Sequence, residues 1–223
     1  MGVRGREPPD YIHILMSVVG IVPAGGSGER LGADRPKAFV VCAGRPLIEW
    51  SLEVLEAVCD RVVVAAPPEW LRDGWVEGGP SRSASVRNAL AAAPEARTAV
   101  VHDAARPLVT RELVEACVGA LVGVDGAIAA TRVIDTVKEA YPDATVLRTL
   151  DRSRLWAVQT PQVFRAEALR RALDVDDAAL AAATDDASLV EAAGGTVRLV
   201  EAPPENFKVT TEADLARAEA ALC

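Results

Sequence analysis

The segment from Val22 to Lys37, VPAGGSGERLGADRPK, has the residue types of a polyphosphate-binding loop. It follows an apolar run and contains glycines at positions 25, 26, 28 and 32, together with the cations Arg30 and Lys37. Glycines let a backbone approach a polyphosphate closely and turn its N–H groups inward, while Arg and Lys balance the negative charge. A strand followed by such a loop is typical of a nucleoside triphosphate site at the carboxyl end of a strand.

This loop matches neither of the two commonest phosphate-binding motifs. The pattern G-x-x-x-x-G-K-[ST] is absent, and Gly26-x-Gly28 is followed by Arg30 and Leu31 where G-x-G-x-x-G requires its third glycine. The alternative is a flexible surface turn, but such a turn does not need two cations placed among its glycines. We therefore interpret the loop as a nucleotide-binding element.

A second cluster, Asp103 and Arg106 in VHDAARP, follows a predicted strand and should lie at the same sheet edge as the glycine loop. A carboxylate there can hold Mg²⁺ against a triphosphate or accept a hydrogen bond from a ribose hydroxyl. Helix capping or a turn is the alternative role for Asp103. His102 has the chemistry of a general base, but we interpret it as a partly buried residue at the end of the strand.

Two further clusters carry cations. Arg152, with Thr160 and Arg132, can hold the phosphate of a second substrate, because arginine presents a planar fork of donors; surface charge on a solvated hairpin is the alternative. Lys208 comes just after a predicted strand and before the last helix, which directs another cation to the same sheet edge. For the TDD sequence at 184–186, helix capping explains as much as a functional role does.

Strand and helix patterns alternate along most of the chain. This alternation predicts an α/β fold with a doubly wound, mostly parallel, Rossmann-like sheet that is covered on both faces. The last helix should start at Thr211, which forms a capping box with Asp214. Buried strands are predicted at 18–22, 61–66, 98–102, 127–131 and 196–200. Helices are predicted at 47–59, 83–93 (opened by Ser83), from 110, at 165–173, at 184–193 and from 211.

The alternation is interrupted at residues 133–159, where two short β-type runs flank Tyr-Pro-Asp at 141–143. We interpret this segment as a β-hairpin arm inserted into a single domain that spans residues 16–223. A hairpin without a helix to cover it usually packs against a partner subunit. Residues 1–15 are expected to form an extension outside the fold, either a disordered tail or a segment that precedes a true start at Met16.

The composition argues against several classes of protein and indicates the kind of core. The 223 residues carry a net charge of −8, which argues against non-specific binding to nucleic acid or to an anionic membrane. Half of the residues are hydrophobic but only 4% are aromatic, so the core should consist of Ala, Val and Leu. The four cysteines are far apart and form no C-x-x-C, which favours a reduced, cytoplasmic protein with structural thiols over a zinc site.

Six motifs, in order along the chain, resemble those of the 2-C-methyl-D-erythritol 4-phosphate cytidylyltransferases of the non-mevalonate isoprenoid pathway. The resemblance extends from about Val18 to the C-terminus, and although the glycine loop alone indicates only the nucleotidyltransferase superfamily, the ordered set is specific. The motifs are VPAGGSGERLGADRPKAF, VHDAARP, DTVK, VQTPQVF, TDDASL and NFKVTT.

The resemblance implies the transfer of CMP from CTP to 2-C-methyl-D-erythritol 4-phosphate by a homodimer that exchanges its arms, with Mg²⁺ or another divalent cation as cofactor. It implies that Arg30 and Lys37 stabilise the transition state, and that Arg152 and Lys208 position the acceptor phosphate. The remaining residues implied by the resemblance are Asp103 at the nucleotide and the metal, Ala24, Gly25, Gly26, Gly28 and Ser85 at the nucleotide, and Arg106, Thr136 and Thr160 at the acceptor.

The chain departs from the family pattern at two positions. Gly25 replaces the second alanine of the usual P-A-A-G, a change that removes one methyl group and causes no steric conflict. Glu205 stands where an aspartate or a small polar residue is common, so the family pattern assigns it no metal or acceptor role.

The predicted reaction needs no general base, which agrees with the absence of a convincing catalytic His or Cys. A phosphate monoester has a second pKa near 6, so the attacking oxygen is already deprotonated at neutral pH. Three alternatives stay open: a cytidylyltransferase for another polyol phosphate such as ribitol 5-phosphate, a guanylyltransferase of molybdenum cofactor, and a non-catalytic nucleotide sensor. The presence of Arg30, Lys37 and Lys208 together argues against the sensor.

Overall fold

The computed structural model describes residues 17–223, and the predicted extension at 1–15 lies outside the described residues. A seven-stranded sheet forms the centre, with the strand order β11-β7-β10-β6-β1-β4-β5. Its members are β1 (Val18–Pro23), β4 (Arg61–Ala66), β5 (Val76–Glu77), β6 (Thr98–Val101), β7 (Gly126–Arg132), β10 (Trp156–Arg165) and β11 (Val197–Glu201). Neighbouring strands in this described sheet are parallel, except that β10 is antiparallel to both β6 and β7.

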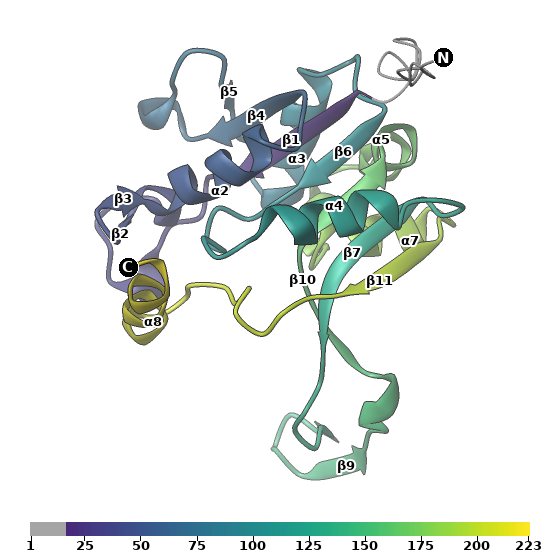
Figure 1. The fold of residues 1–223 in the computed structure, drawn as a ribbon. Helices are drawn as coiled ribbons and strands as arrows, with labels where there is room; N and C mark the ends of the chain where they lie inside the picture. The colour runs from purple at the N-terminus through teal and green to yellow at the C-terminus, as the bar shows by residue number, and fades with distance from the viewer. Residues whose placement is uncertain (1–16) are drawn as a thin grey trace, which may run out of the picture.

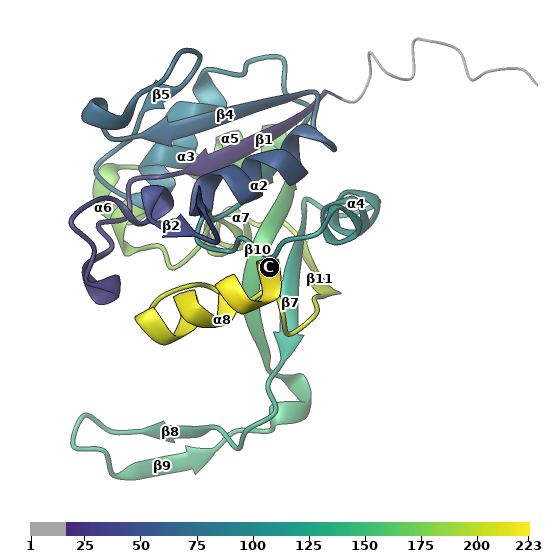
Figure 2. The same cartoon turned by 60° about the vertical axis from the view of Figure 1, so that its left-hand side comes forward.

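Helices cover both faces of the sheet, as the alternating pattern predicts (Figures 1 and 2). On one face, buried residues of α3 (Arg82–Ala91), α5 (Ala166–Leu173), α6 (Asp177–Ala182) and α7 (Asp186–Ala192) pack on the strands. On the other face, α2 (Leu47–Glu56) and α4 (Arg111–Gly119) do the same. Both clusters consist mainly of Ala, Val and Leu, so the predicted doubly wound α/β fold and the small-residue core are confirmed.

A third, smaller apolar cluster holds the C-terminal helix α8 (Glu212–Leu222) against the segment that follows the glycine loop. That segment contains the short 3₁₀ turns η1 (Glu29–Leu31) and η2 (Lys37–Phe39) and the small hairpin of β2 (Val41–Cys42) and β3 (Arg45–Pro46). Thr211 and Asp214 form the predicted capping box at the start of α8. Because α8 packs there, the chain just before it is held beside the glycine loop.

The arm is a two-stranded hairpin of β8 (Lys138–Ala140) and β9 (Val146–Thr149), which pair with each other and belong to no larger sheet. The chain enters the arm from β7 and returns through η4 (Arg152–Arg154) into β10. Figures 1 and 2 show the hairpin projecting from the body of the molecule beyond the ends of β7 and β10. Its strands have almost no buried residues, so this chain supplies no core for it.

One local prediction is wrong, and several elements are not predicted. The helix predicted at 83–93 is capped not by Ser83 but by Ser81, whose side chain accepts a hydrogen bond from the Ala84 N–H, while Ser83 is buried in the first turn. No strand is predicted at 156–165, yet β10 lies inside the sheet, between β7 and β6. Several short elements are not predicted either, among them β5, α6 and η3 (Pro68–Trp70). The described residues 17–223 contain no helix with the length and apolar character needed to cross a bilayer.

Candidate active site

A cavity of about 410 Å³ opens at the carboxyl ends of β1 and β6. The chain turns from β1 to β4 on one side and later returns to β6 on the other, so the cavity lies where the order of the strands reverses. Its lining comprises Pro23, Ala24, Gly25, Gly26, Ser27, Gly28, Glu29, Arg30, Lys37, Ala38, Gly79, Pro80, Ser81, Arg82, Ser85, Asp103, Ala104, Ala105 and Lys208. Most of the site residues predicted from the sequence are therefore brought together in one place.

The glycine loop forms one wall of the cavity. It is closed by a hydrogen bond of 2.8 Å from the Lys37 N–H to the Gly26 carbonyl. Gly28 has φ 78°, and a Cβ there would lie 2.9 Å from the Arg35 carbonyl oxygen, so only glycine fits without strain. A Cβ at Gly25 or Gly26 would meet no atom within 4 Å, so this stretch of backbone is open to a ligand. The free space at position 25 also agrees with the expectation that either glycine or alanine fits there.

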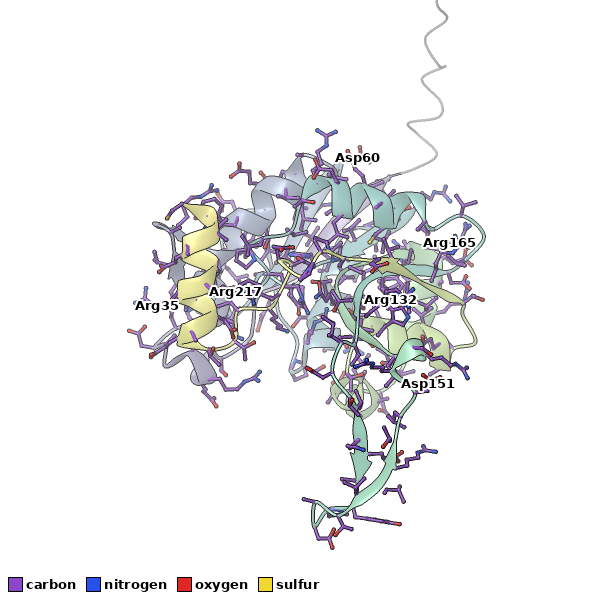
Figure 3. All side chains as sticks on the ribbon, turned by 60° about the horizontal axis from the view of Figure 1, so that its bottom comes forward. Arg35, Asp60, Arg132, Asp151, Arg165 and Arg217 are labelled. Atoms are coloured by element: carbon purple, nitrogen blue, oxygen red, sulfur yellow. The ribbon has the colours of Figure 1, made fainter. Side chains whose placement is uncertain are left out.

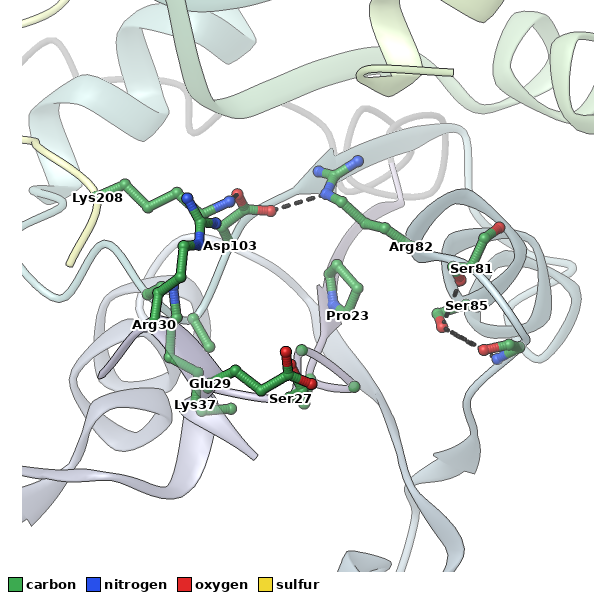
Figure 4. A pocket seen from close by; sticks show the side chains of 18 of the residues that line it. Pro23, Ser27, Glu29, Arg30, Lys37, Ser81, Arg82, Ser85, Asp103 and Lys208 are labelled. Atoms are coloured by element: carbon green, nitrogen blue, oxygen red, sulfur yellow. Dashed lines mark hydrogen bonds and ion pairs between the residues drawn. The ribbon is translucent and has the colours of Figure 1, made fainter. Parts of the chain in front are cut away.

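Three cations gather beside this wall. Figure 4 shows Arg30 and Lys208 extending toward Asp103, with Lys37 on the loop below. The Lys37 ammonium donates a hydrogen bond of 3.1 Å to the Val209 carbonyl, which fixes it next to Lys208. Burial and the neighbouring charges of Lys208 and Arg30 lower the pKa of Lys37. Cations held this close repel one another, so a bound polyanion would stabilise the cluster.

Asp103 lies at the centre of the cavity's charges. Its side chain is only 12% exposed, its Oδ1 accepts a hydrogen bond of 2.9 Å from Arg82, and its Oδ2 accepts one of 2.7 Å from Lys208. Burial alone would raise the pKa of this carboxyl, but the charges of Arg82 and Lys208 outweigh burial and hold the pKa below its ordinary range. Asp103 is thus ionised. Its carbonyl begins a turn by accepting a hydrogen bond of 3.0 Å from the Arg106 N–H, but its carboxylate binds two cations and caps no helix.

Arg82 is a charged cavity residue that the sequence analysis does not identify. It is the first residue of α3 and binds Asp103 through Nε and the buried carboxylate of Asp186 through Nη1. Both partners raise the pKa of Arg82 against the opposing effect of burial. The sequence GGPSR before the predicted helix does not indicate that Arg82 binds two aspartates, because an arginine near the start of a helix is usually solvated.

Ser85 joins the start of α3 to the loop before it, which completes the opposite wall. Its hydroxyl accepts a hydrogen bond of 3.0 Å from the Gly79 N–H and donates one of 3.0 Å to the Ser81 carbonyl. A Cβ on Gly79 would lie 2.5 Å from the Ala84 Cβ, so this close approach requires glycine. The wall is therefore rigid and presents backbone groups to the cavity.

Arg106 and Thr160 do not line the cavity; both are buried behind it. Arg106 donates a hydrogen bond of 2.8 Å to the Asn206 carbonyl, and the Asn206 amide donates to the Thr160 carbonyl at 2.9 Å. The Thr160 hydroxyl accepts a hydrogen bond of 3.0 Å from the Asp103 N–H. In this chain the two residues thus support the loops that carry Asp103 and Lys208.

His102 is fully buried, more so than predicted, and does not reach the cavity. Its Nε2 lies 3.2 Å from the Arg106 carbonyl, which can only accept, so Nε2 carries the proton and Nδ1 accepts from the Thr160 hydroxyl. Burial lowers the pKa of His102 to about 4. The imidazole is therefore neutral at physiological pH, and the interpretation of His102 as a structural residue is confirmed.

The structure does not bring Arg152, Thr136 or Arg132 into the cavity of their own chain. Arg152 is exposed in η4 and donates to the Ile134 carbonyl, while Thr136 is exposed just before β8. The Arg132 guanidinium stacks on the Trp156 ring, 4.3 Å from its centroid. Figure 3 shows Arg132 and Asp151 near the base of the arm, with the arm side chains extending outward.

A doubly wound α/β sheet with a glycine loop, converging cations and a buried ionised carboxylate at its switch point defines a nucleotidyltransferase. Comparison with known proteins makes the assignment specific: the sequence profile of the 2-C-methyl-D-erythritol 4-phosphate cytidylyltransferases matches residues 18–223. The chain belongs to this family.

Individual relatives agree with this assignment. The 2-C-methyl-D-erythritol 4-phosphate cytidylyltransferase of Nocardia farcinica is 44% identical over 92% of this chain and 94% of its own length. That of Synechococcus elongatus is 39% identical over 89% of this chain and 93% of its own. The crystal structure of the Thermus thermophilus enzyme superposes with a TM-score of 0.79 at 38% identity, covering 92% of this chain and 98% of that one.

Proposed function

We propose that this chain transfers CMP from CTP to 2-C-methyl-D-erythritol 4-phosphate in isoprenoid precursor biosynthesis. The products are 4-diphosphocytidyl-2-C-methyl-D-erythritol and pyrophosphate. Family membership over residues 18–223 gives the reaction. The observation that carries the mechanism is the convergence of Arg30, Lys37, Asp103 and Lys208 on the cavity beside the glycine loop.

The reaction is an in-line displacement at the α-phosphorus of CTP. An oxygen of the acceptor phosphate forms the new P–O bond, the bond to the bridging oxygen of the β-phosphate breaks, and that oxygen leaves with pyrophosphate. The acceptor monoester is already deprotonated at neutral pH, so no side chain has to remove a proton. This agrees with a buried, neutral His102 that lies outside the cavity.

The barrier is electrostatic, because two anions must meet and negative charge accumulates on the leaving oxygens. Arg30 and Lys37 are assigned the stabilisation of that charge, since both line the cavity beside the glycine loop. Lys208 is assigned to the acceptor phosphate. Burial and the charges of Lys208 and Arg30 lower the pKa of Lys37, and the negative charge of a bound phosphate opposes them, so the bound state favours the charged form of Lys37.

Asp103 fits the role of a ligand to Mg²⁺ or another divalent cation. Within residues 17–223 no group of three or more His, Cys, Asp and Glu side chains could hold a metal, so most ligands would come from the triphosphate and water, as Mg²⁺ commonly accepts. Each Asp103 oxygen accepts one hydrogen bond here and so retains a lone pair. When bound, the cation neutralises charge on the triphosphate.

The acceptor site is proposed to be completed by a second copy of this chain. Arg152 and Thr136 belong to the arm and do not line the cavity of their own chain. The arm region also exposes Ile134, Tyr141, Val146, Leu147 and Val158, an apolar surface typical of an interface. In a two-fold dimer the arm of each chain would bring Arg152 to the cavity of the other, where it would position the acceptor.

The cytoplasm is the proposed location. All four cysteines are free, and Cys42, Cys59 and Cys117 are buried in the core. Burial raises the pKa of the Cys59 and Cys117 thiols to about 12, so these groups stay protonated and inert. Unpaired structural thiols are typical of a reducing compartment.

The experiment that tests the function is an assay of pyrophosphate release. Each of CTP, UTP, ATP and GTP is combined with 2-C-methyl-D-erythritol 4-phosphate or ribitol 5-phosphate, with Mg²⁺ and with EDTA. We expect turnover with CTP and methylerythritol phosphate, and its loss with EDTA. Turnover with ribitol 5-phosphate alone would show a different polyol phosphate as substrate, and nucleotide binding without turnover would show a sensor.

A further inference from the structure

Asp186 is a buried carboxylate with a single hydrogen-bonding partner in the described chain. It is the first residue of α7 and fully buried, and its Oδ2 accepts a hydrogen bond of 2.6 Å from Arg82 Nη1. Its Oδ1 is buried and contacts no donor within residues 17–223. Burial raises the pKa of Asp186, and the charge of Arg82 opposes that effect.

The structure separates the roles of the two aspartates in the TDD sequence. Asp185 is the cap of α7, because its Oδ1 accepts a hydrogen bond of 2.9 Å from the Ser188 N–H. Asp185 also accepts a hydrogen bond of 2.8 Å from the Gln162 side chain, and it does not line the cavity. Capping therefore explains Asp185 and leaves the carboxylate of Asp186 unexplained.

Arg82 connects Asp186 to the cavity. Its Nη1 binds Asp186, and its Nε donates to Asp103 Oδ1 at 2.9 Å, while Asp103 Oδ2 accepts from Lys208. The four side chains thus form a row of alternating charge that runs from the interior under α7 to the cavity. Figure 4 shows the outer part of this row, with Arg82, Asp103 and Lys208 side by side.

Stability alone does not favour such a row. Replacing a buried ion pair by apolar residues of similar volume is often neutral or stabilising, because two charges must be removed from water. A guanidinium bound at both ends, however, has little freedom to rotate. Arg82 held in this way fixes the direction of the Asp103 carboxylate, and Asp103 in turn fixes the Lys208 ammonium.

We propose that Asp186 is a positioning residue for cytidylyl transfer, which holds Arg82 and thereby orients Asp103 and Lys208 in the cavity. The inference rests on the proposed function, because that function gives Asp103 and Lys208 their roles. Asp186 itself does not line the cavity and is not assigned any contact with substrate.

The test compares Asp186→Asn with the matched variant Asp185→Asn on the same turn of the chain. In Asp186→Asn, kcat should fall by roughly tenfold or more, the scale of a small misplacement of reacting groups. The KM for CTP should rise by less than kcat falls, since the glycine loop, Arg30 and Lys37 are untouched. Asp185→Asn should keep its kcat. Equal kcat values in Asp186→Asn and the wild type would overturn the proposal, and so would an equal loss in both variants.

A double-mutant cycle shows whether Asp186 acts through Arg82. If it does, adding Asp186→Asn to Arg82→Gln should change kcat by less than about twofold, because no guanidinium remains to be held. A further large fall would overturn the proposal. If Asp186→Asn alone fails to fold, the double variant of Arg82→Gln and Asp186→Asn, which removes both charges of this pair, should itself show the roughly tenfold fall in kcat. A wild-type kcat in the double variant would overturn the proposal, because Asp186 can then have no effect through Arg82.

The variant Asp103→Asn separates a failure of the proposed function from a failure of the role proposed for Asp186. Wild-type activity in this variant would overturn the role given to Asp103 in the proposed function. A large loss in Asp103→Asn together with normal kcat in Asp186→Asn would overturn only the positioning role of Asp186.

Discussion

The cavity and the arm both carry charged side chains, but the two regions hold them in different ways. In the cavity, Asp103 is 12% exposed and bound by two cations, and it lies on a loop fixed to the sheet. On the arm, Arg148 and Glu139 pair at 2.5 Å while their side chains are 67% and 41% exposed. The charged groups of the cavity are therefore held in place within one chain. The arm has no core of its own, and its side chains are held only by local pairs.

The largest effect is expected for the loop cations of the cavity. Lys37→Ala or Arg30→Ala should lower kcat by roughly 10²–10³, the scale for one preorganised contact to a transition state. The fold should persist, because neither side chain belongs to an apolar core cluster. Steady-state kinetics and a thermal melt check both expectations.

Arg35→Ala is the matched control on the same loop. Arg35 pairs with Asp34 at the surface and does not line the cavity, so its removal should leave kcat near the wild-type value. A Lys37 variant with normal kcat and only a raised KM for CTP would reduce the role of Lys37 to ground-state binding.

The next effect concerns the arm. Arg152→Ala should lower kcat/KM for the acceptor by roughly 10², because the attacking phosphate would lose its orientation. The neighbouring Arg154→Ala serves as control. Both residues are exposed in η4, so neither change should alter stability much.

Mixing variants shows which chain Arg152 serves. A heterodimer of Lys37→Ala and Arg152→Ala chains has one site with both defects and one with neither, if the arm crosses to the partner. With random pairing half of the dimers are mixed, so about a quarter of wild-type activity should return. No recovery after verified subunit exchange would place Arg152 at the cavity of its own chain.

A smaller effect, on the free energy of unfolding, is expected from His102, which is buried behind the cavity. The pKa of His102 is about 4 in the folded chain because of burial, against about 6.5 when unfolded. The unfolded state therefore binds more protons between these values, and stability falls as pH decreases from about 6.5 toward 4. The His102 contribution between pH 7 and pH 5 is about 2 kcal/mol.

Urea unfolding of the wild type and His102→Gln at both pH values isolates this contribution from that of the carboxylates. The variant should lose less stability than the wild type on acidification. The same loss in both proteins would show that His102 does not titrate as its burial requires.

The smallest effect is expected on the arm surface. Glu139→Gln removes the ion pair with Arg148, and because both partners are exposed the free energy of unfolding should change by less than about 0.5 kcal/mol. Chemical denaturation measures it. A much larger loss would mean that a partner chain buries this pair, which would remove the contrast between the two regions.

Local sequence patterns predict several strands of the sheet and several charged residues of the cavity. Apolar runs of four to six residues located β1, β4, β6 and β7, because parallel central strands are buried on both faces. Once these strands were placed, the residues after them had to meet at one edge, which located Arg30, Lys37, Asp103 and Lys208. The capping box at Thr211 was predictable because it lies within a single turn.

Features that depend on distant partners were not predictable in this way. The strand β10 contains Gln159, Thr160 and Gln162, and it lies inside the sheet, where these polar groups find partners in His102, Asp185 and Asn206. Arg82 is separated from Asp186 by 104 positions, and nothing in either local sequence indicates the pair. In isolation Asp186 cannot be told from its capping neighbour.

The position of β10 also has a consequence for how the chain is made. Strands β6 and β7 do not pair with each other; β10 lies between them and joins the two parts of the sheet. A nascent chain that has emerged only to residue 155 lacks both β10 and β11, so one edge of β6 and both edges of β7 expose unpaired N–H and C=O groups. At about 5–20 residues per second this interval lasts seconds, during which those edges are open to mispairing or to a chaperone. Synthesis of the arm immediately precedes synthesis of the strand that closes the sheet.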